Sequence, residues 1–149
     1  PPRMIQRLIA KITQSNQDQA LSETDISTVA TALLIEVINA DHKQTESEWL
    51  VLQEHCASAF QLSISDTDAL IREARELSRS ATSLWEHTDL INKKFDSDSK
   101  YRLILAMWKI AYADSDIDRY EEHLIRKVSD LIYIPHTLFI KAKHEASNI

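Results

Sequence analysis

The chain has 149 residues, of which 44% are hydrophobic and 27% charged, and its net charge is −6, so it can bury the core of one globular domain. It contains no glycine and only three prolines, which disfavours all-β and doubly wound folds and excludes glycine-rich phosphate loops and dinucleotide fingerprints. Its basic residues are dispersed and outnumbered by acidic ones, so a general nucleic-acid surface is not expected.

The first predicted element, within residues 1–15, is an amphipathic basic helix from Pro2 to about Thr13. Its apolar residues share one face, at Ile5, Leu8, Ile9 and Ile12. Its basic residues recur every four positions, at Arg3, Arg7 and Lys11. Such a helix can dock on an anionic membrane or an acidic partner, but packing against its own domain is the expected arrangement. The polar residues 15–22 then predict a loop.

Apolar residues at helical spacing predict seven more helices. The second runs from Ser22 to Ala40, and the third follows Thr45, which forms a capping-box signature with Glu48. The fourth starts at Ser65 and ends near residue 77. The other four are centred on residues 84–95, 103–111, 124–132 and 135–142. The predicted fold is therefore all-α, a compact single-domain bundle of seven to eight helices.

The single cysteine, Cys56, cannot form an internal disulfide, which suits a reducing cytoplasm. Its spacing with Leu52 and Phe60 predicts a buried structural thiol on an apolar helical face. No apolar run approaches the roughly 20 residues of a membrane helix, and no secretory signal pattern is present. A cytoplasmic location is expected.

The densest cluster of carboxylates lies between the sixth and seventh predicted helices. Five fall within nine positions: Asp114, Asp116, Asp118, Glu121 and Glu122. A close group of oxygen donors is what Ca²⁺ or Mg²⁺ requires. The spacing does not fit an EF-hand, because the sixth position counted from Asp114 is Arg119 where that loop needs a glycine.

A second interpretation of this cluster needs no ion. Asp118 can be the N-cap of the seventh helix, with Glu121 completing a capping box three residues later. Acidic residues in a first turn are also favoured by the helix dipole. Capping does not account for Asp114 and Asp116. The sequence therefore leaves two interpretations of the cluster, a cation site and a solvated helix cap.

The helix-loop-helix unit that contains this cluster occurs twice, in repeats of about residues 28–78 and 100–147. A shift of 73 positions, from 41 to 114, aligns Asp41 with Asp114 and Glu48 with Glu121. If the two copies pack face to face about an approximate two-fold axis, their loops lie near each other. Asp41 and Glu48 would then share a site with Asp114 and its neighbours.

At this repeat the sequence resembles the TerB-like family, named for a bacterial tellurite-resistance protein. The family pattern is an apolar helix ending in Ala-Asp-Gly, an aliphatic residue, a polar cap and a glutamate that starts the next helix. Residues 113–118 with Glu121 follow this pattern, and residues 40–42 with Thr45 and Glu48 follow it more loosely. The family glycines are replaced here by Ser115 and His42.

The resemblance covers about residues 28–147 and implies paired helical hairpins in a bacterial cytoplasmic protein. It also implies a link to tellurite and other stress resistance, and a protein partner within a membrane-associated complex. Metal binding at the acidic loops is implied as well, which points to a primary and a secondary set of ligands. These are Asp114, Asp116, Asp118 and Glu121 first, then Asp41 and Glu48.

Catalytic motifs are missing from the sequence. None of the six histidines forms an H-E-x-x-H pair or lies at Cys/His zinc spacing, so no catalytic residue is assigned and the protein is not expected to be an enzyme. Two functions from different classes are expected instead. One is a divalent-cation binding domain, with Ca²⁺ or Mg²⁺ as its cofactor, and the other is a non-catalytic interaction scaffold without bound metal.

Overall fold

The computed structural model describes residues 15–41, 43–80, 84–113 and 117–148, and for residues 15–25 it describes the backbone alone. These residues form seven helices and contain no strand, which confirms the predicted all-α class. The helices are α2 (Ser15–Ala40), α3 (Glu46–Ala59), α4 (Ile64–Ser80), α5 (Leu84–Lys94), α6 (Ser97–Ala111), α7 (Arg119–Leu131) and α8 (His136–Ser147). The predicted helix at residues 2–13 lies outside the described part of the chain.

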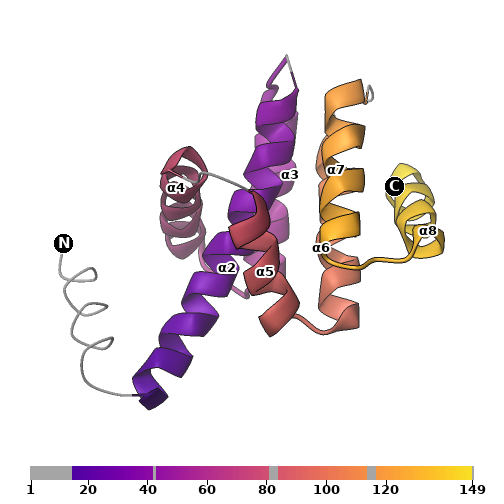
Figure 1. The fold of residues 1–149 in the computed structure, drawn as a ribbon. Coiled ribbons are helices and arrows are strands. Elements are labelled where there is room, and N and C mark those ends of the chain that lie inside the picture. Colours follow the sequence, from indigo (N-terminus) through magenta and orange to yellow (C-terminus); the bar gives the residue numbers. More distant parts are fainter. Residues whose placement is uncertain (1–14, 42, 81–83, 114–116, 149) are drawn as a thin grey trace.

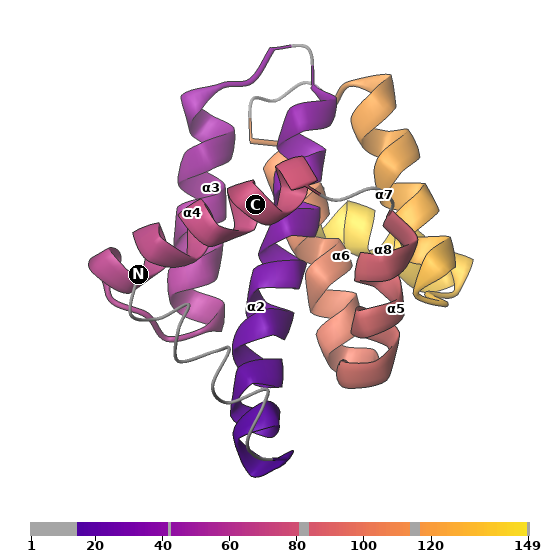
Figure 2. The same cartoon turned by 60° about the vertical axis from the view of Figure 1, so that its left-hand side comes forward.

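Helix α2 is the centre of the bundle, and α3, α4, α5, α6 and α7 all pack against it. Figures 1 and 2 show the shorter helices arranged around it. Its second half is apolar over most of its circumference, and Leu33, Val37 and Ile38 have no exposed surface. A helix that is apolar on all sides is stable only inside a core, which is why the neighbours surround it.

Helix α6 forms the second layer of the core and packs on α3, α7 and α8. Trp108 of α6 is completely buried, and its ring meets that of Phe139 of α8 edge to face at a centroid distance of 5.3 Å. In Figure 1, α8 and α4 lie on opposite sides of the molecule. Cys56 of α3 is also fully buried and lies 3.6 Å from Thr31 Oγ1, which confirms the predicted structural thiol.

The C-terminal ends of α2 and α6 and the N-terminal ends of α3 and α7 lie at the same end of the bundle (Figures 1 and 2). The α2–α3 pair and the α6–α7 pair are each antiparallel and closely packed. This arrangement brings Asp41, Glu48 and Glu121 to one end of the molecule, where the candidate site lies.

The structure corrects two predicted helix starts. Helix α2 begins at Ser15, so the predicted loop at residues 15–22 and the predicted start at Ser22 are wrong. That segment is polar, but it contains glutamine, alanine and leucine and no proline or glycine, and these residues favour a helix. Helix α4 begins one residue before the predicted Ser65, because Ser63 Oγ accepts the backbone N–H of Asp66 at 3.1 Å and caps the helix.

Helices α3 and α7 end in the same way although the chain has no glycine. Gln61 and Tyr133 follow them with φ of 52° and 62°, in the left-handed region. In each case the next N–H bonds back to a carbonyl of the last turn, from Leu62 to Ala57 at 3.0 Å and from Ile134 to Ser129 at 2.8 Å. This is the Schellman pattern, which usually places glycine at the left-handed position.

None of the helices in the described ranges is long and apolar enough to cross a membrane.

Candidate metal centre

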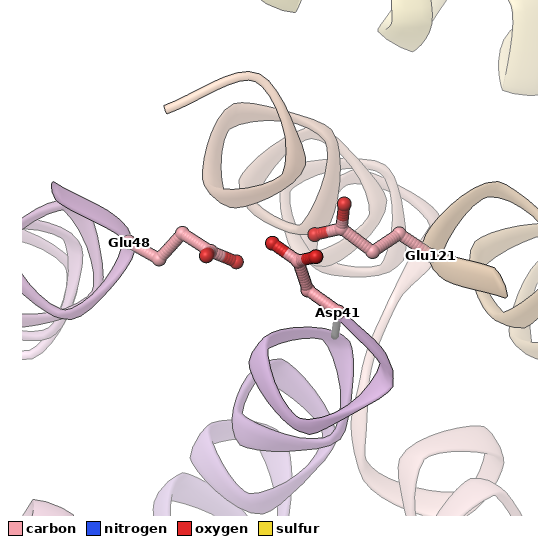
Figure 3. Close-up of side chains that lie close together, drawn as sticks. All are labelled: Asp41, Glu48 and Glu121. Atoms are coloured by element: carbon pink, nitrogen blue, oxygen red, sulfur yellow. The ribbon is translucent and has the colours of Figure 1, made fainter. Parts of the chain in front are cut away.

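Three buried carboxylates from three different helix ends meet at the end of the bundle where α3 and α7 begin. Asp41 follows the last residue of α2, Glu48 lies in the first turn of α3, and Glu121 lies in the first turn of α7. One oxygen from each carboxylate lies within 4.8 Å of the others. Asp41 is 8% exposed and the two glutamates are completely buried. Figure 3 shows the three side chains pointing toward one another.

The two glutamates are held in place by capping boxes, as the sequence predicted. Glu48 Oε1 accepts the backbone N–H of Thr45 at 3.1 Å, and Thr45 Oγ1 accepts the N–H of Glu48 at 3.4 Å. Glu121 Oε1 accepts the N–H of Asp118 at 3.0 Å, and the Asp118 side chain caps α7 in return. In each box the cap holds the carboxylate in place through Oε1.

Asp41 is in a less favourable position than the two glutamates. Its Oδ1 accepts the backbone N–H of Lys43 at 3.0 Å. Its Oδ2 is buried and has no hydrogen-bond partner among the described residues, and no ion pair to Asp41 occurs among them. It also lies at the C-terminal end of α2, where the helix dipole disfavours a negative charge. A buried carboxylate oxygen in this position requires a cation, a proton or an ordered water.

The helix dipoles favour the other two carboxylates, because Glu48 and Glu121 lie in the first turns of α3 and α7. Three carboxylates this close still repel one another strongly in a low-dielectric interior. A divalent cation between them would remove that repulsion and would supply the missing partner of Asp41.

The other predicted ligands have different positions. Asp118 Oδ1 accepts the N–H of Tyr120 at 2.8 Å, which is the capping role that the sequence left open. Glu122 belongs to the acidic stretch but was not a predicted ligand, and it pairs with Lys143 of α8 at 3.1 Å. Asp114 and Asp116 lie outside the described residues. The cluster therefore contains Glu121, one of the four ligands predicted first, together with Asp41 and Glu48, the two predicted second. Metal binding by these residues remains a prediction.

The geometry and chemistry of the cluster suit a hard cation. The three cluster oxygens lie within 4.8 Å of one another. Ca²⁺ accepts six to eight oxygen ligands in flexible geometry, whereas Mg²⁺ demands a near-ideal octahedron and gives up its waters reluctantly, so a buried group of protein carboxylates favours Ca²⁺. The cluster contains no histidine or cysteine, the ligands that predominate in zinc sites.

The sequence profile of one family, described as tellurite resistance protein TerB, matches residues 27–144. No curated protein and no solved structure matches the chain. The match spans well over half of the chain and includes all three residues of the cluster. The chain therefore belongs to the TerB family.

Proposed function

We propose that the chain is a divalent-cation binding domain in which Asp41, Glu48 and Glu121 hold the ion, with Ca²⁺ preferred over Mg²⁺. The observation that carries this proposal is the convergence of three buried carboxylates, one of which has a buried oxygen without a partner. The arrangement supplies three hard oxygen ligands. Backbone carbonyls and waters supply the rest of a coordination shell of six to eight.

The capping boxes support the proposal because they make the cluster rigid. Glu48 and Glu121 cannot turn toward solvent without giving up the hydrogen bonds to Thr45 and Asp118. Loss of such a cap costs about 1 kcal/mol. The carboxylates therefore relieve their mutual repulsion by taking up a cation or protons rather than by moving apart.

The ion would join the α2–α3 pair to the α6–α7 pair, because its ligands come from both. This is a binding and structural role, and the chain is proposed not to be an enzyme. The family description supports a link to tellurite resistance. We propose further that the domain acts within a stress-resistance assembly, as a module whose binding depends on the cation.

A metal-free scaffold is the second candidate. The two capping boxes favour the metal-free scaffold, because they account for the burial of Glu48 and Glu121 without any ion. They do not account for Oδ2 of Asp41. On this alternative, added cations leave the stability of the domain unchanged.

Calorimetric titration of the metal-stripped protein with Ca²⁺, Mg²⁺, Mn²⁺ and Zn²⁺ separates the two candidates. We expect saturable heat with Ca²⁺, weaker binding of Mg²⁺, and at least a tenfold loss of affinity in Asp41→Asn. Asp130→Asn, at an exposed position in the last turn of α7, is the matched control and should bind as the wild type does. Heats equal to those of dilution for every ion would rule out the cation site.

The double variant Asp114→Asn, Asp116→Asn tests the preceding loop in the same titration. A loss of affinity comparable to that of Asp41→Asn would add the loop carboxylates to the coordination shell. Unchanged affinity would confine the site to the three buried carboxylates.

A further inference from the structure

A groove of about 470 Å³ lies between α3 and α4, and none of the three clustered carboxylates lines it. Trp49 of α3 and Ile71 of α4 supply its apolar surface, and Arg72 and Arg75 of α4 supply its charge. Ile71 is only 8% exposed, so it forms the floor, whereas both arginines are exposed. We call this feature the Trp49 groove.

The two arginines share a helical face because residues 68, 71, 72 and 75 are three or four positions apart. The guanidinium of Arg75 lies over the ring of Trp49, 4.7 Å from its centroid. Such a cation–π contact holds the guanidinium plane against the aromatic surface. Arg75 is therefore held in place before any ligand arrives.

Neither Arg72 nor Arg75 forms an ion pair within the described ranges. Other arginines on the surface do, as Arg79 pairs with Glu76 at 2.8 Å and Arg102 with Asp98 at 2.7 Å. Asp68 lines the same groove but pairs with neither arginine. The groove thus presents two guanidinium groups and one carboxylate, a local positive charge on a chain whose net charge is −6.

We propose that the Trp49 groove docks an acidic segment of a partner protein, with an apolar side chain against Trp49 and Ile71 and carboxylates on Arg72 and Arg75. Guanidinium groups bind carboxylates through paired N–H donors in a fixed geometry. Tryptophan and arginine are also among the residue types that contribute most at protein interfaces. The amides of Gln44 and Gln53, which also line the groove, suit the backbone of an extended peptide.

Charge selects this occupant over two others. Nucleic acid would need several basic side chains along its phosphate backbone, and the groove offers only two arginines. The basic segment at Arg3, Arg7 and Lys11 has the same sign as the groove, so it is not a matching intramolecular ligand. The proposal uses no residue of the carboxylate cluster, and it stands whether or not a cation binds there.

The test is fluorescence anisotropy with a fluorescein-labelled peptide of Glu-Leu-Glu repeats, added to the full chain at low ionic strength. A peptide with glutamine in place of every glutamate is the control ligand. We expect saturable binding of the acidic peptide at submillimolar concentration, and at least tenfold weaker binding of the glutamine peptide. Binding should weaken with added salt, because the arginines are exposed.

Two double variants with the same change in net charge identify the surface. Arg72→Glu, Arg75→Glu should weaken binding of the acidic peptide at least tenfold. Arg79→Glu, Arg102→Glu, which reverses two arginines outside the groove, should keep the affinity within about twofold. Trp49→Phe should retain most of the affinity because it keeps an aromatic surface, and Trp49→Ala should lose it.

Three results would overturn the proposal. The first is no binding of the acidic peptide up to one millimolar. The second is equal weakening in both double variants, which would indicate attraction to the surface as a whole. The third is binding only of a further peptide in which phosphoserine replaces one leucine, which would assign the arginines to phosphate. Circular dichroism of the arginine variants should match the wild type, because the substituted arginines are exposed.

Discussion

Glu48 and Glu121 perform the same structural task at the starts of α3 and α7. Each is completely buried, and each accepts the backbone N–H of its N-cap residue through Oε1, at 3.1 and 3.0 Å. Both carboxylates also contribute an oxygen to the cluster with Asp41. The glutamates that cap two helices are therefore also the glutamates that would hold the ion. A useful substitution must remove the negative charge while keeping the capping hydrogen bond.

Glu121→Gln meets this requirement, because glutamine keeps an oxygen for the cap and loses the charge. In chelator, we expect its free energy of unfolding to equal or exceed that of the wild type, since like-charge repulsion is reduced. With Ca²⁺ at about a hundred times its Kd, the wild type should gain about 2.7 kcal/mol and the variant should gain little. Urea unfolding with and without Ca²⁺ measures both.

The control for this prediction is Glu122→Gln, which removes a neighbouring carboxylate that pairs with Lys143 at the surface. It should retain the full response to Ca²⁺. A response that survives in Glu121→Gln would show that Glu121 is not a ligand.

Asp118→Ser tests whether Asp118 serves as a cap or as a ligand. Serine can accept the N–H of Tyr120 in place of the Asp118 carboxylate, so the variant should be nearly as stable as the wild type, while Asp118→Ala should lose about 1 kcal/mol. We expect calorimetry to give Asp118→Ser a Ca²⁺ affinity within about threefold of the wild type. A loss of tenfold or more would instead place Asp118 in the coordination shell.

His87 makes the domain sensitive to acid. It is 5% exposed, its Nδ1 has no hydrogen-bond partner in the described structure, and burial lowers its pKa from 6.5, while Glu36 and Glu86 raise it in part. The unfolded chain therefore takes up a proton at higher pH than the folded one, and the free energy of unfolding falls as pH drops below about 6.5. His55 adds to this effect, because burial and Lys109 lower its pKa too.

The acid sensitivity is measured by urea midpoints at about pH 7.5 and pH 5.5. His87→Leu should reduce the difference between the two midpoints, since leucine cannot be protonated. His123→Gln, at an exposed position of α7, should leave the difference unchanged. An equal difference in His87→Leu and the wild type would assign the acid sensitivity to other groups.

Gln61→Gly should stabilise the domain. Gln61 has φ of 52°, and a left-handed conformation costs a residue with Cβ about 1–2 kcal/mol. Glycine removes this cost but adds about 0.4–1 kcal/mol of unfolded-state entropy, so the net gain should be about 1 kcal/mol or less. Thermal unfolding should show a higher Tm for Gln61→Gly than for the wild type, and no increase for Gln61→Ala.

The starts of α3 and α7 could be predicted because a capping box is a local pattern of residues three positions apart, Thr45 with Glu48 and Asp118 with Glu121. The start of α2 could not be predicted from polarity, because the glutamines near residue 15 are both polar and good helix formers. Helix content depends on propensity as well as on burial, and a polar face can continue a helix beyond its apolar part.

The carboxylate cluster was only partly accessible from the sequence. Alignment of Asp41 with Asp114 and of Glu48 with Glu121 predicted that the two loops lie near each other. Local patterns cannot show which carboxylates turn inward, because that depends on the packing of α7 against α2. The Trp49 groove was missed altogether, since Trp49 and Arg75 belong to different helices and only their packing brings the ring under the guanidinium.

The three carboxylates also span a long stretch of the chain, from residue 41 to residue 121. An ion held by all three would close a loop of 80 positions, and a cross-link over such a loop removes much of the conformational freedom of the unfolded chain. The single cysteine cannot provide that link. A chelator would then act on this domain as a reductant acts on a disulfide protein, increasing its unfolding rate and its cleavage by proteases.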